Sequence, residues 1–539
     1  MLDIKRLDHL GLVAGTIKDL KLVEFIDSHF EQNDKENIST GEAIAGMIIN
    51  GLGFTQRPMT LTPQFFENKP LDILFRDGVS ASHFNRFKLG RALDEVHQYG
   101  IEALFSKTAL HVCKKEGIDM NYSHLDTSSF SLTGEYIPDS DENAIKITHG
   151  YSKDHRPDLK QAVLELVVTQ DGAIPFICQC HDGNASDNIV FKNRVANFVE
   201  QIKKGSQPTC VVMDSKGYTE KNTEYLKQIP FITRVPGTFG LEGAITDQAL
   251  CLSDGWCKIN DDYRYQSFSF NYLDFDQRWV VIWSKGAFNR AVSSLERKRD
   301  REKESIDKKL KSLQKQGFES KEDALNAFQK IEDKWKFHKV EEIRYENKIK
   351  YATPGKPTPN TQIKQIDVHI KVDFKENKEY ILEQQQKGAC FVLATNVDPE
   401  KVNDEDIFFN YKKQAGVEQG FRFLKDPLFF TSSLFITKPS RIAGLLMVMT
   451  LSLMVYNIAQ RRMRNELEKR EETIPNQIGK PIKNPTLRWV FQIFEGINFV
   501  KMEIDNEFKS IINGMNSLHK KVIRLFGETT CRIYQISPT

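Results

Sequence analysis

The run Pro208-Thr209-Cys210-Val211-Val212-Met213-Asp214-Ser215-Lys216-Gly217-Tyr218 decides the fold of this chain. Apolar residues occupy both odd and even positions of the run, which predicts a strand buried on both faces. A helix is expected to follow from about Thr219 to Gln228. Asp214 ends the strand, at the edge where open α/β sheets place their active sites. A buried carboxylate is costly unless it is paired or binds a metal, but an Asp here also suits the cap of a following helix. The run alone leaves both roles open.

A second acid lies in a comparable run. Residues 121–134, Asn-Tyr-Ser-His-Leu-Asp-Thr-Ser-Ser-Phe-Ser-Leu-Thr-Gly, are rich in β-branched, aromatic and hydroxyl side chains and show no helical period, which predicts a strand. Asp126 lies in its middle, on the face shared by Tyr122, His124 and Ser128. Asp is depleted inside strands, so the alternative is an exposed Asp on the polar face of an edge strand.

A third acid belongs to a predicted helix. Tyr411, Gln414, Glu418 and Lys425 are spaced so that one helix would hold them within a wedge of about 60°. An apolar stripe beside the wedge is expected to fix the helix on the core, and it consists of Val417, Phe421, Leu424 and Leu428. Gly416 and Gly420 weaken the helix, and Pro427 closes it. The alternative is an ordinary amphipathic helix with a solvated flank.

Together these residues carry a family resemblance. The spacing Tyr411-x2-Gln414-x3-Glu418-x6-Lys425 resembles the Tyr-x2-Arg-x3-Glu-x6-Lys (YREK) signature of cut-and-paste bacterial transposases. Asp126 and Asp214 stand where that family has its first two catalytic acids. Residues 181–187, His-Asp-Gly-Asn-Ala-Ser-Asp, resemble the stretch after the third strand of its catalytic domain. The chain is therefore similar to DDE transposases of the insertion sequence 4 superfamily, and its N-terminal region and residues 150–158, Gly-Tyr-Ser-Lys-Asp-His-Arg-Pro-Asp, point to the insertion sequence 1634 group.

The resemblance implies a ribonuclease-H-like catalytic domain with two Mg²⁺ ions, for which Mn²⁺ can substitute. Asp126 would bridge both ions, and Asp214 and Glu418 would each close one side. Carboxylates suit this chemistry because Mg²⁺ prefers hard oxygen ligands and a pair of ions serves both the nucleophile and the leaving oxygen. Gln414 departs from the signature, where the family has an Arg that helps hold the transposon-end backbone.

The expected partner is double-stranded DNA, both the terminal inverted repeats of the element and the target, bound by a homodimer in the synaptic complex. Tyr411, Gln414 and Lys425 would contact end phosphates. The family often forms a hairpin end with a flipped base on an aromatic side chain, and Trp283 is the candidate favoured here. Trp256 and Trp279 are alternatives, and each Trp also suits a core position. Two other functions remain open: a ribonuclease-H-like nuclease without strand transfer, and a non-enzymatic, transposase-derived DNA-binding protein.

Length and composition agree with a large enzyme. The chain has 539 residues and a net charge of +2, with 75 basic and 73 acidic residues, so a nucleic-acid surface would require the basic residues to be segregated. The eight Cys form no CxxC pair, and Cys178-x-Cys180-His181 fits alternating strand positions better than a metal site. No signal-peptide segment opens the chain, which predicts a cytoplasmic, nucleoid-associated bacterial protein. The apolar run 442–456 is too short to span a bilayer and predicts a buried helix without membrane contact.

The chain is expected to be α/β, in five regions. Residues 1–118 form a helical end-recognition domain whose Ser39-Thr40-Gly41-Glu42 stretch resembles a helix start. Residues 119–236 form the first part of the catalytic domain. Residues 237–388 form an insertion with strands and then long charged helices over 290–350, and Pro354 to Pro359 link back to the sheet, which is expected to resume near Ala389. Residues 389–470 complete the catalytic domain with the Glu418 helix, and residues 471–539 are a C-terminal region suited to dimerisation.

Overall fold

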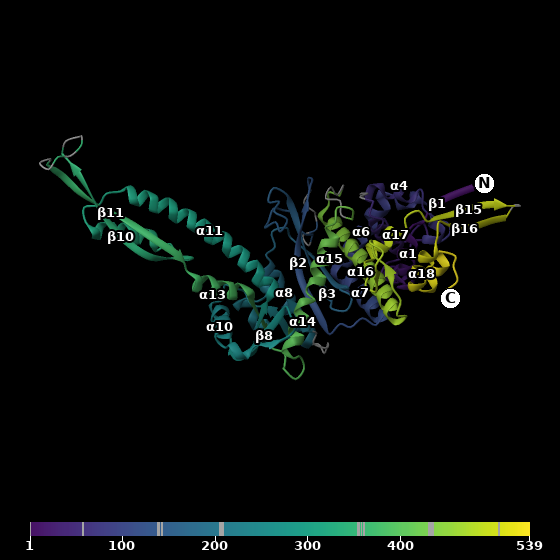
Figure 1. Cartoon of the computed structure of the whole chain (residues 1–539). Coiled ribbons are helices and arrows are strands. Elements are labelled where there is room, and N and C mark those ends of the chain that lie inside the picture. Colours follow the sequence, from purple (N-terminus) through teal and green to yellow (C-terminus); the bar gives the residue numbers. More distant parts are fainter. Residues whose placement is uncertain are drawn as a thin grey trace. The chain divides into compact units, whose positions relative to one another are not determined.

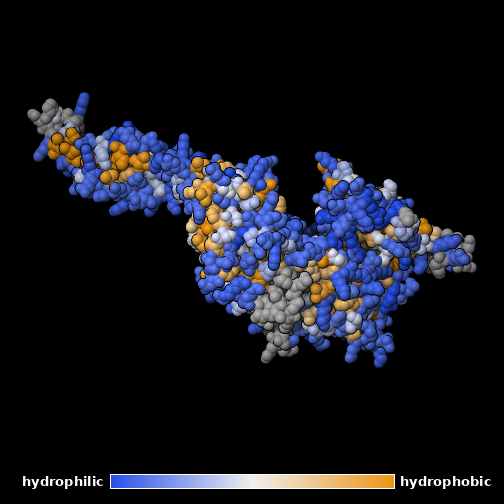
Figure 2. All heavy atoms as spheres, turned by 90° about the horizontal axis from the view of Figure 1, so that it is seen from below, coloured by the Kyte–Doolittle hydropathy of each residue, from blue (hydrophilic) through white to orange (hydrophobic). Residues whose placement is uncertain are grey.

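The computed structural model describes residues 2–55, 59–136, 141, 144–203, 210–352, 356, 358, 362–429, 436–504 and 507–538. The chain divides into two compact units. Unit 1 comprises Met1–Thr233 and Phe409–Thr539, and unit 2 comprises Arg234–Phe408. The architecture is mixed α/β, with both parallel and antiparallel strand pairs and many helices (Figure 1). Most of the surface seen in Figure 2 is hydrophilic, with smaller hydrophobic patches.

Unit 1 begins with one short strand and a set of helices. They are β1 (Leu2–Arg6), α1 (Leu10–Asp19), α2 (Leu22–Asp27), α3 (Thr40–Leu52), α4 (Thr62–Phe66), α5 (Leu71–Leu74), α6 (Arg86–Tyr99) and α7 (Ile101–Glu116). The predicted helix start at Ser39 is confirmed: the Ser39 hydroxyl accepts the Glu42 N–H at 3.0 Å, and the Glu42 carboxylate accepts the Ser39 N–H at 2.9 Å. This reciprocal cap satisfies two donors at the start of α3.

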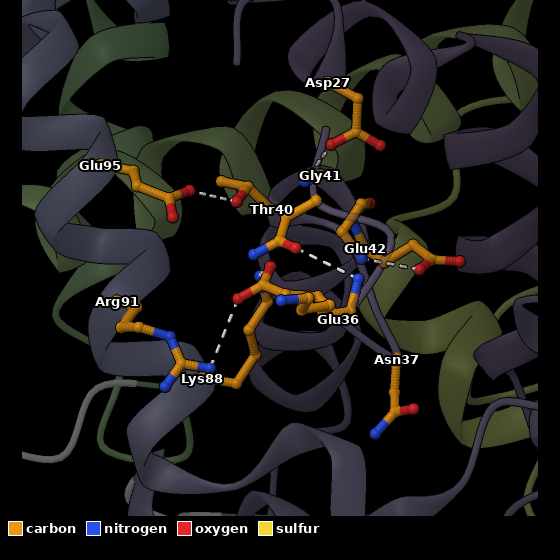
Figure 3. A network of polar contacts seen from close by, with 12 residues as sticks. Asp27, Glu36, Asn37, Thr40, Gly41, Glu42, Lys88, Arg91 and Glu95 are labelled. Carbon is orange, nitrogen blue, oxygen red and sulfur yellow. Dashed lines mark hydrogen bonds and ion pairs between the residues drawn. The ribbon is translucent and has the colours of Figure 1, made fainter. Parts of the chain in front are cut away.

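Charged residues around α3 tie it to α2 and α6 (Figure 3). Asp27 on α2 accepts the Gly41 N–H at 2.6 Å, where a side chain on Gly41 would collide with the Val23 carbonyl oxygen. The buried Lys88 ammonium on α6 pairs with Glu36, because a buried cation must be compensated. The start of α3 is therefore fixed by paired charges as well as by apolar packing.

The C-terminal part of unit 1 packs on these helices. Its central element is α16 (Pro439–Lys469), which lies against α1, α3, α6 and α7. Among the described residues, α16 is the one helix that is long and apolar enough to cross a membrane. However, 94% of its most apolar 18-residue segment is buried inside the protein. The prediction of a buried helix is thus confirmed. The remaining elements are β13 (Ile474–Pro475), β14 (Pro481–Ile482), α17 (Leu487–Ile493), β15 (Asn498–Ile504), β16 (Glu507–Asn513), α18 (Ser517–Leu525) and α19 (Glu528–Ile533), and β15 pairs with β1.

The sheet of unit 1 has the strand order β4-β3-β2-β5-β6. β2 pairs antiparallel with β3 and β3 pairs antiparallel with β4, whereas β5 and β6 are parallel to β2. The bounds are β2 (Tyr122–Leu132), β3 (Lys160–Thr169), β4 (Pro175–His181), α8 (Asp187–Lys203), β5 (Cys210–Met213), α9 (Glu220–Leu226) and β6 (Phe231–Arg234). The strands predicted at residues 121–134 and 208–214 and the helix predicted from about Thr219 are confirmed as β2, β5 and α9, and β2 is a central strand, not the edge strand of the alternative interpretation.

Unit 2 combines antiparallel strands with long helices. Its elements are α10 (Gly240–Cys251), β7 (Cys257–Lys258), β8 (Tyr263–Tyr272), β9 (Phe275–Ser284), α11 (Lys285–Lys315), α12 (Lys321–Glu332), β10 (His338–Tyr351), β11 (Ile363–Glu376), α13 (Lys378–Ala389) and β12 (Cys390–Thr395). β12 pairs antiparallel with β9, so the strand near Ala389 continues a sheet to which β8 and β9 already belong. We call α11, α12, β10 and β11 together the arm; it has its own small core around Ile306, Leu310 and Phe328.

Three predictions are wrong in this region. The helical pattern predicted over 290–350 ends at Glu332, and residues 338–351 form strand β10, because their apolar side chains pack one face of the β10–β11 hairpin on α11 and α12. The stretch Pro354 to Pro359 joins β10 to β11 rather than leading back to the sheet, and most of it lies outside the described residues. The single helix predicted over 411–425 is two helices, α14 (Asp404–Lys412) and α15 (Ala415–Leu424).

The break between α14 and α15 has a local cause. The Gln414 N–H bonds to the Tyr411 carbonyl at 3.0 Å and the Val417 N–H to the Gln414 carbonyl at 3.2 Å, which tightens the chain to a 3-residue turn. Gly416, a poor helix former, follows at once. Val417 and Leu424 are buried as predicted, but Leu428 is 38% exposed because it lies beyond the end of α15.

Candidate active site

Asp126 and Asp214 lie side by side on neighbouring strands. The parallel register of β2 and β5 pairs His124 with Val212 and Leu125 with Met213, so its next step brings Asp126 level with Asp214. Neighbouring strands are about 4.8 Å apart, which brings the two carboxylates within electrostatic reach. The register therefore assembles two acids that are 88 positions apart in the sequence.

Burial dominates the electrostatics of Asp126. Desolvation raises the pKa of its carboxyl to about 6, the nearby Lys153 ammonium opposes that rise, and the Asp214 carboxylate adds to it. The carboxylate accepts the Thr127 N–H at 2.7 Å. A carboxyl whose charged form is disfavoured in this way gains from any cation that reaches it, so Asp126 and Asp214 are candidates for holding a cation.

Asp214 has the capping role that its sequence allowed. Its carboxylate accepts the Lys216 N–H at 2.9 Å and so caps the short turn Ser215–Gly217, which separates β5 from α9. Its carbonyl oxygen accepts the Thr233 hydroxyl at 3.1 Å, which ties the strand end to β6. The cap holds the carboxylate at the strand end beside Asp126, and therefore capping and site formation are compatible.

Helix α15 covers the face of β2 that carries Asp126. At one end of α15 the buried Gln414 donates from Nε2 to the Leu125 carbonyl at 3.1 Å, and its Oε1 lies 3.0 Å from Nδ1 of His124. At the other end the Lys425 ammonium lies 5.4 Å from the centre of the Phe130 ring. His124, Asp126 and Phe130 share one face of the strand, so the helix runs along that face (Figure 1).

The same contacts place Glu418. Four residues of helix advance about 6 Å beyond Gln414, and two residues of strand advance about 6.6 Å beyond Leu125, which sets Glu418 level with Thr127, next to Asp126. The Glu418 side chain is exposed, so the third acid stands at the solvent edge of the site.

The three acids do not form a closed cluster. Among the residues that the structure describes, no group of three or more His, Cys, Asp or Glu side chains is close enough to hold a metal ion together. The donor set nevertheless fits Mg²⁺, which takes hard oxygen ligands and is commonly held by one or two carboxylates together with water and substrate phosphate. Asp126 and Asp214 could supply such a pair.

A cavity of about 380 Å³ adjoins the acids. It is lined by Ser129, Tyr151, Lys153, Val163, Ala185, Ser186 and Lys216. The Lys153 ammonium donates to the Thr127 carbonyl at 2.5 Å and to the Thr127 hydroxyl at 2.9 Å, so this cation sits one residue from Asp126. Two ammonium groups and three hydroxyl groups around one cavity provide the charge and the donors that a phosphate requires.

The stretch 181–187 builds one wall of this cavity. Gly183 N–H donates to the Lys146 carbonyl at 2.9 Å, and its own carbonyl accepts Nε2 of Gln161 at 2.6 Å. A side chain at Gly183 would stand 2.0 Å from the Gln161 carbonyl oxygen, so only glycine fits there. This close approach fixes the turn after β4 and brings Ala185 and Ser186 to the cavity.

The remaining predicted residues are placed as follows. Tyr411 is half-buried on α14, and Lys425 pairs with Asp154 at 2.7 Å. Gln414, predicted to contact DNA, is only 6% exposed and its amide is bonded within the protein. In unit 2, Trp283 donates to the Gln386 side chain at 3.0 Å.

The two alternative candidates for base stacking, Trp256 and Trp279, differ in burial. Trp279 is fully buried in the core of unit 2. Trp256 is half-buried, and the Arg264 guanidinium lies over both its ring and that of Trp283, at 5.0 and 4.5 Å. Trp279 therefore has the core role that its sequence allowed, and Trp256 and Trp283 keep partly accessible rings.

Sequence reasoning missed the cations and hydroxyls of the cavity. Lys153 lies in the loop between β2 and β3, Lys216 lies in the turn after Asp214, and Ser129 and Ser186 resemble ordinary polar surface positions. The available signal was that Lys153 and Ser186 fall inside the two stretches quoted for the family resemblance, and Lys216 within two residues of Asp214.

Comparison with known proteins gives limited matches. Residues 2–110 match a family model described as "Domain of unknown function (DUF4277)". No curated protein matches. Among solved structures, a cryo-EM structure of the piggyBac transposase synaptic complex with hairpin DNA is similar at 7% identity, covering 92% of this chain and 82% of that chain, with a TM-score of 0.34. That score is too low to establish the fold or the activity of this chain.

Proposed function

We propose that this chain is a DDE transposase that moves an insertion sequence by cut-and-paste, through metal-dependent cleavage of DNA and strand transfer. The observation that carries the proposal is the placement of Asp126 and Asp214 on adjacent parallel strands, with Glu418 on the helix that covers the same face. The strand order β4-β3-β2-β5-β6, antiparallel and then parallel, supports the ribonuclease-H-like interpretation of unit 1.

In the proposed reaction Asp126, Asp214 and Glu418 would hold two Mg²⁺ ions, or Mn²⁺ in their place. When bound, these ions supply activation of the attacking oxygen and stabilisation of the leaving oxygen. Lys153 and Lys216 hold the scissile phosphate in the adjoining cavity, where their charge offsets that of the phosphate as negative charge builds on its oxygens.

The proposed chemistry is balanced without a further co-reactant. Water adds to phosphorus as the bond from phosphorus to the 3′ oxygen breaks, so the element end leaves as a 3′-OH and the flanking strand keeps a 5′-phosphate. The freed 3′-OH then attacks a phosphodiester of the opposite strand or of the target; the bond from that phosphorus to its 3′ oxygen breaks, and the attacked strand leaves with a new 3′-OH. Lys425 and Tyr411 are proposed to contact the end phosphates, for which Lys425 must leave Asp154.

The proposal extends to partners and organisation. We propose that a homodimer pairs two element ends in the bacterial cytoplasm, with residues 1–118 recognising the terminal repeats and residues 471–539 contributing to the dimer. Trp283 is the proposed stacking residue if a hairpin end forms, because its ring is partly accessible and lies beneath a guanidinium. These assignments rest on the resemblance of the sequence motifs.

The deciding experiment follows a labelled element end with purified protein and Mg²⁺. We expect nicking and joining by the wild type, and neither by Asp126→Ala, Asp214→Ala or Glu418→Ala, although all three still bind the end. Glu220→Ala, an exposed acid in the first turn of α9, is the matched control and should keep activity. Nicking without joining indicates a nuclease, and binding without nicking by the wild type indicates a DNA-binding protein; substantial cutting by an acid variant excludes that residue.

A further inference from the structure

The net charge of +2 hides a segregation of basic residues on one helix. α11 carries eleven Lys and Arg against five Asp and Glu, so the rest of the chain is net negative. Arg290, Arg297, Arg301, Lys308 and Lys315 on α11 are all exposed. At about 100° per residue these five residues lie within roughly 40° of one another, and they form what we call the α11 stripe.

The α11 stripe faces away from the core of the arm. Ile306, Leu310 and Leu313 are the buried residues of α11, and they point about 140–180° away from the stripe. From Arg290 to Lys315 the stripe is about 37 Å long at 1.5 Å per residue. A rigid helix therefore presents a straight row of cations to solvent.

The cations of the stripe lack the partners that other cations of the arm have. On the β10–β11 hairpin, Arg344 pairs with Asp373, Lys371 with Glu346 at 2.5 Å and Lys375 with Glu341 at 3.4 Å. Within the described part of the chain, Arg290, Arg301, Lys308 and Lys315 make no side-chain hydrogen bond or ion pair, and Arg297 donates only to the Ser293 carbonyl. These cations of the hairpin are thus ion-paired, whereas no ion pair is found for the cations of the stripe among the described residues.

We infer that the α11 stripe binds the phosphate backbone of double-stranded DNA without sequence preference. A duplex carries one negative charge per about 1.7 Å of its axis, so a long row of cations meets a high density of phosphate charge whatever the base sequence. The stripe is about as long as one turn of the duplex, roughly 34–36 Å. This surface lies outside the proposed active site, and the inference rests on the proposed function, whose DNA partner it assigns to a second surface.

The partner is DNA rather than an acidic protein because of the shape of the stripe. The stripe is a straight row of five cations with no apolar residue among them. It can therefore bind an elongated polyanion through charge contacts alone. A stable protein interface needs a buried apolar centre, which this face of α11 does not provide. Binding should therefore depend strongly on salt, since each phosphate contact releases counterions.

The test measures anisotropy of a labelled 30-base-pair duplex of unrelated sequence between 50 and 300 mM NaCl, with full-length protein. The stripe variant replaces all five cations by Gln, a good helix former: R290Q/R297Q/R301Q/K308Q/K315Q. The control removes the same charge from ion-paired positions of the arm: R299Q/K339Q/R344Q/K371Q/K375Q. Circular dichroism verifies that both variants keep their helices.

We expect the stripe variant to lose at least 100-fold in affinity at 100 mM NaCl, and its salt slope to fall by about four, at about 0.9 per lost contact. The control should change by less than about threefold, because screened surface pairs contribute little. Equal effects of the two variants, or competition by polyglutamate as strong as by duplex, overturn the inference. A wild type that binds no duplex also contradicts the proposed function, whereas duplex binding that survives in the stripe variant contradicts the stripe alone.

Discussion

Gln414 donates from Nε2 to the Leu125 carbonyl oxygen at 3.1 Å, and this bond fastens the start of α15 to the strand that carries Asp126. Its Oε1 also lies 3.0 Å from the His124 ring, so both ends of the amide are used. Gln414→Leu keeps the size of the side chain but leaves the Leu125 carbonyl and the His124 ring without these partners. We expect a loss of about 2–3 kcal/mol in the free energy of unfolding in urea.

The matched control is Gln419→Leu, on the exposed side of the same helix, which should change the free energy by less than about 0.5 kcal/mol. Equal stability of the two variants would show that the Gln414 amide does not hold α15. Because Gln414 is buried, an Arg at this position is also expected to destabilise the chain rather than to strengthen DNA binding.

Buried strands of the unit 1 sheet could be predicted because consecutive apolar residues, as in Val211-Val212-Met213, indicate a strand buried on both faces. The sequence did not predict that β2 is central, since that depends on pairing with β5, a segment 88 positions away. It misassigned β10, because Lys and Glu dominate its exposed face and conceal the alternation of Val340, Ile343 and Tyr345. Lys153 was missed because only the folded loop brings it to Asp126.

The raised pKa of Asp126 predicts a cost to stability. Its pKa of about 6 in the folded protein lies above the ordinary value of 3.8, so the fold disfavours the ionised form. The cost to stability is complete above pH 6 and disappears as the pH falls towards 4. Asp126→Asn should therefore stabilise the protein by about 1–3 kcal/mol at pH 7.5. Thermal unfolding without metal should show that gain shrinking to nothing at pH 4. A gain that is independent of pH, or a loss at pH 7.5, contradicts burial as the cause.

A buried ion pair supports the sheet behind the cavity. Arg194 on α8 donates from Nε to Glu165 on β3 at 2.5 Å, and Glu165 also lies 2.8 Å from the His181 ring. Both Arg194 and Glu165 are almost fully buried, and these partners hold the pKa of Glu165 below its usual value. Arg194→Met leaves a buried carboxylate without its main partner and should cost about 3–5 kcal/mol.

The double variant Arg194→Met with Glu165→Gln tests that explanation, because it removes the unpaired charge. It should recover at least half of the loss in a urea titration at pH 7.5. If the double variant is no more stable than Arg194→Met, the loss comes from packing rather than from the unpaired charge of Glu165.

The proposed carboxylate site predicts a choice among divalent cations. Mg²⁺ or Mn²⁺ should support cutting of a labelled element end, and EDTA should stop it. Ca²⁺ should allow end binding with little cutting, because its larger and looser coordination misplaces the reacting oxygens. The measurement is gel analysis of cut ends in each cation, with end binding followed in parallel. Full activity in EDTA would exclude the proposed two-metal site.

Lys153 offers the sharpest test of the cavity, because its two proposed effects have opposite signs. Its ammonium lies one residue from Asp126 and opposes the rise in the pKa of that carboxyl. Lys153→Met removes a cation that competes with a bound metal, so Mn²⁺ affinity, measured by calorimetry at pH 7.5, should rise severalfold. Cutting should nevertheless fall by about 10²-fold, since a donor to the scissile phosphate is lost. Lys160→Met, at the start of β3, is the control and should change neither quantity. If Lys153→Met cuts as well as the wild type, Lys153 does not hold the phosphate, and if Mn²⁺ affinity falls, the cation supports the carboxylates rather than competing with the metal.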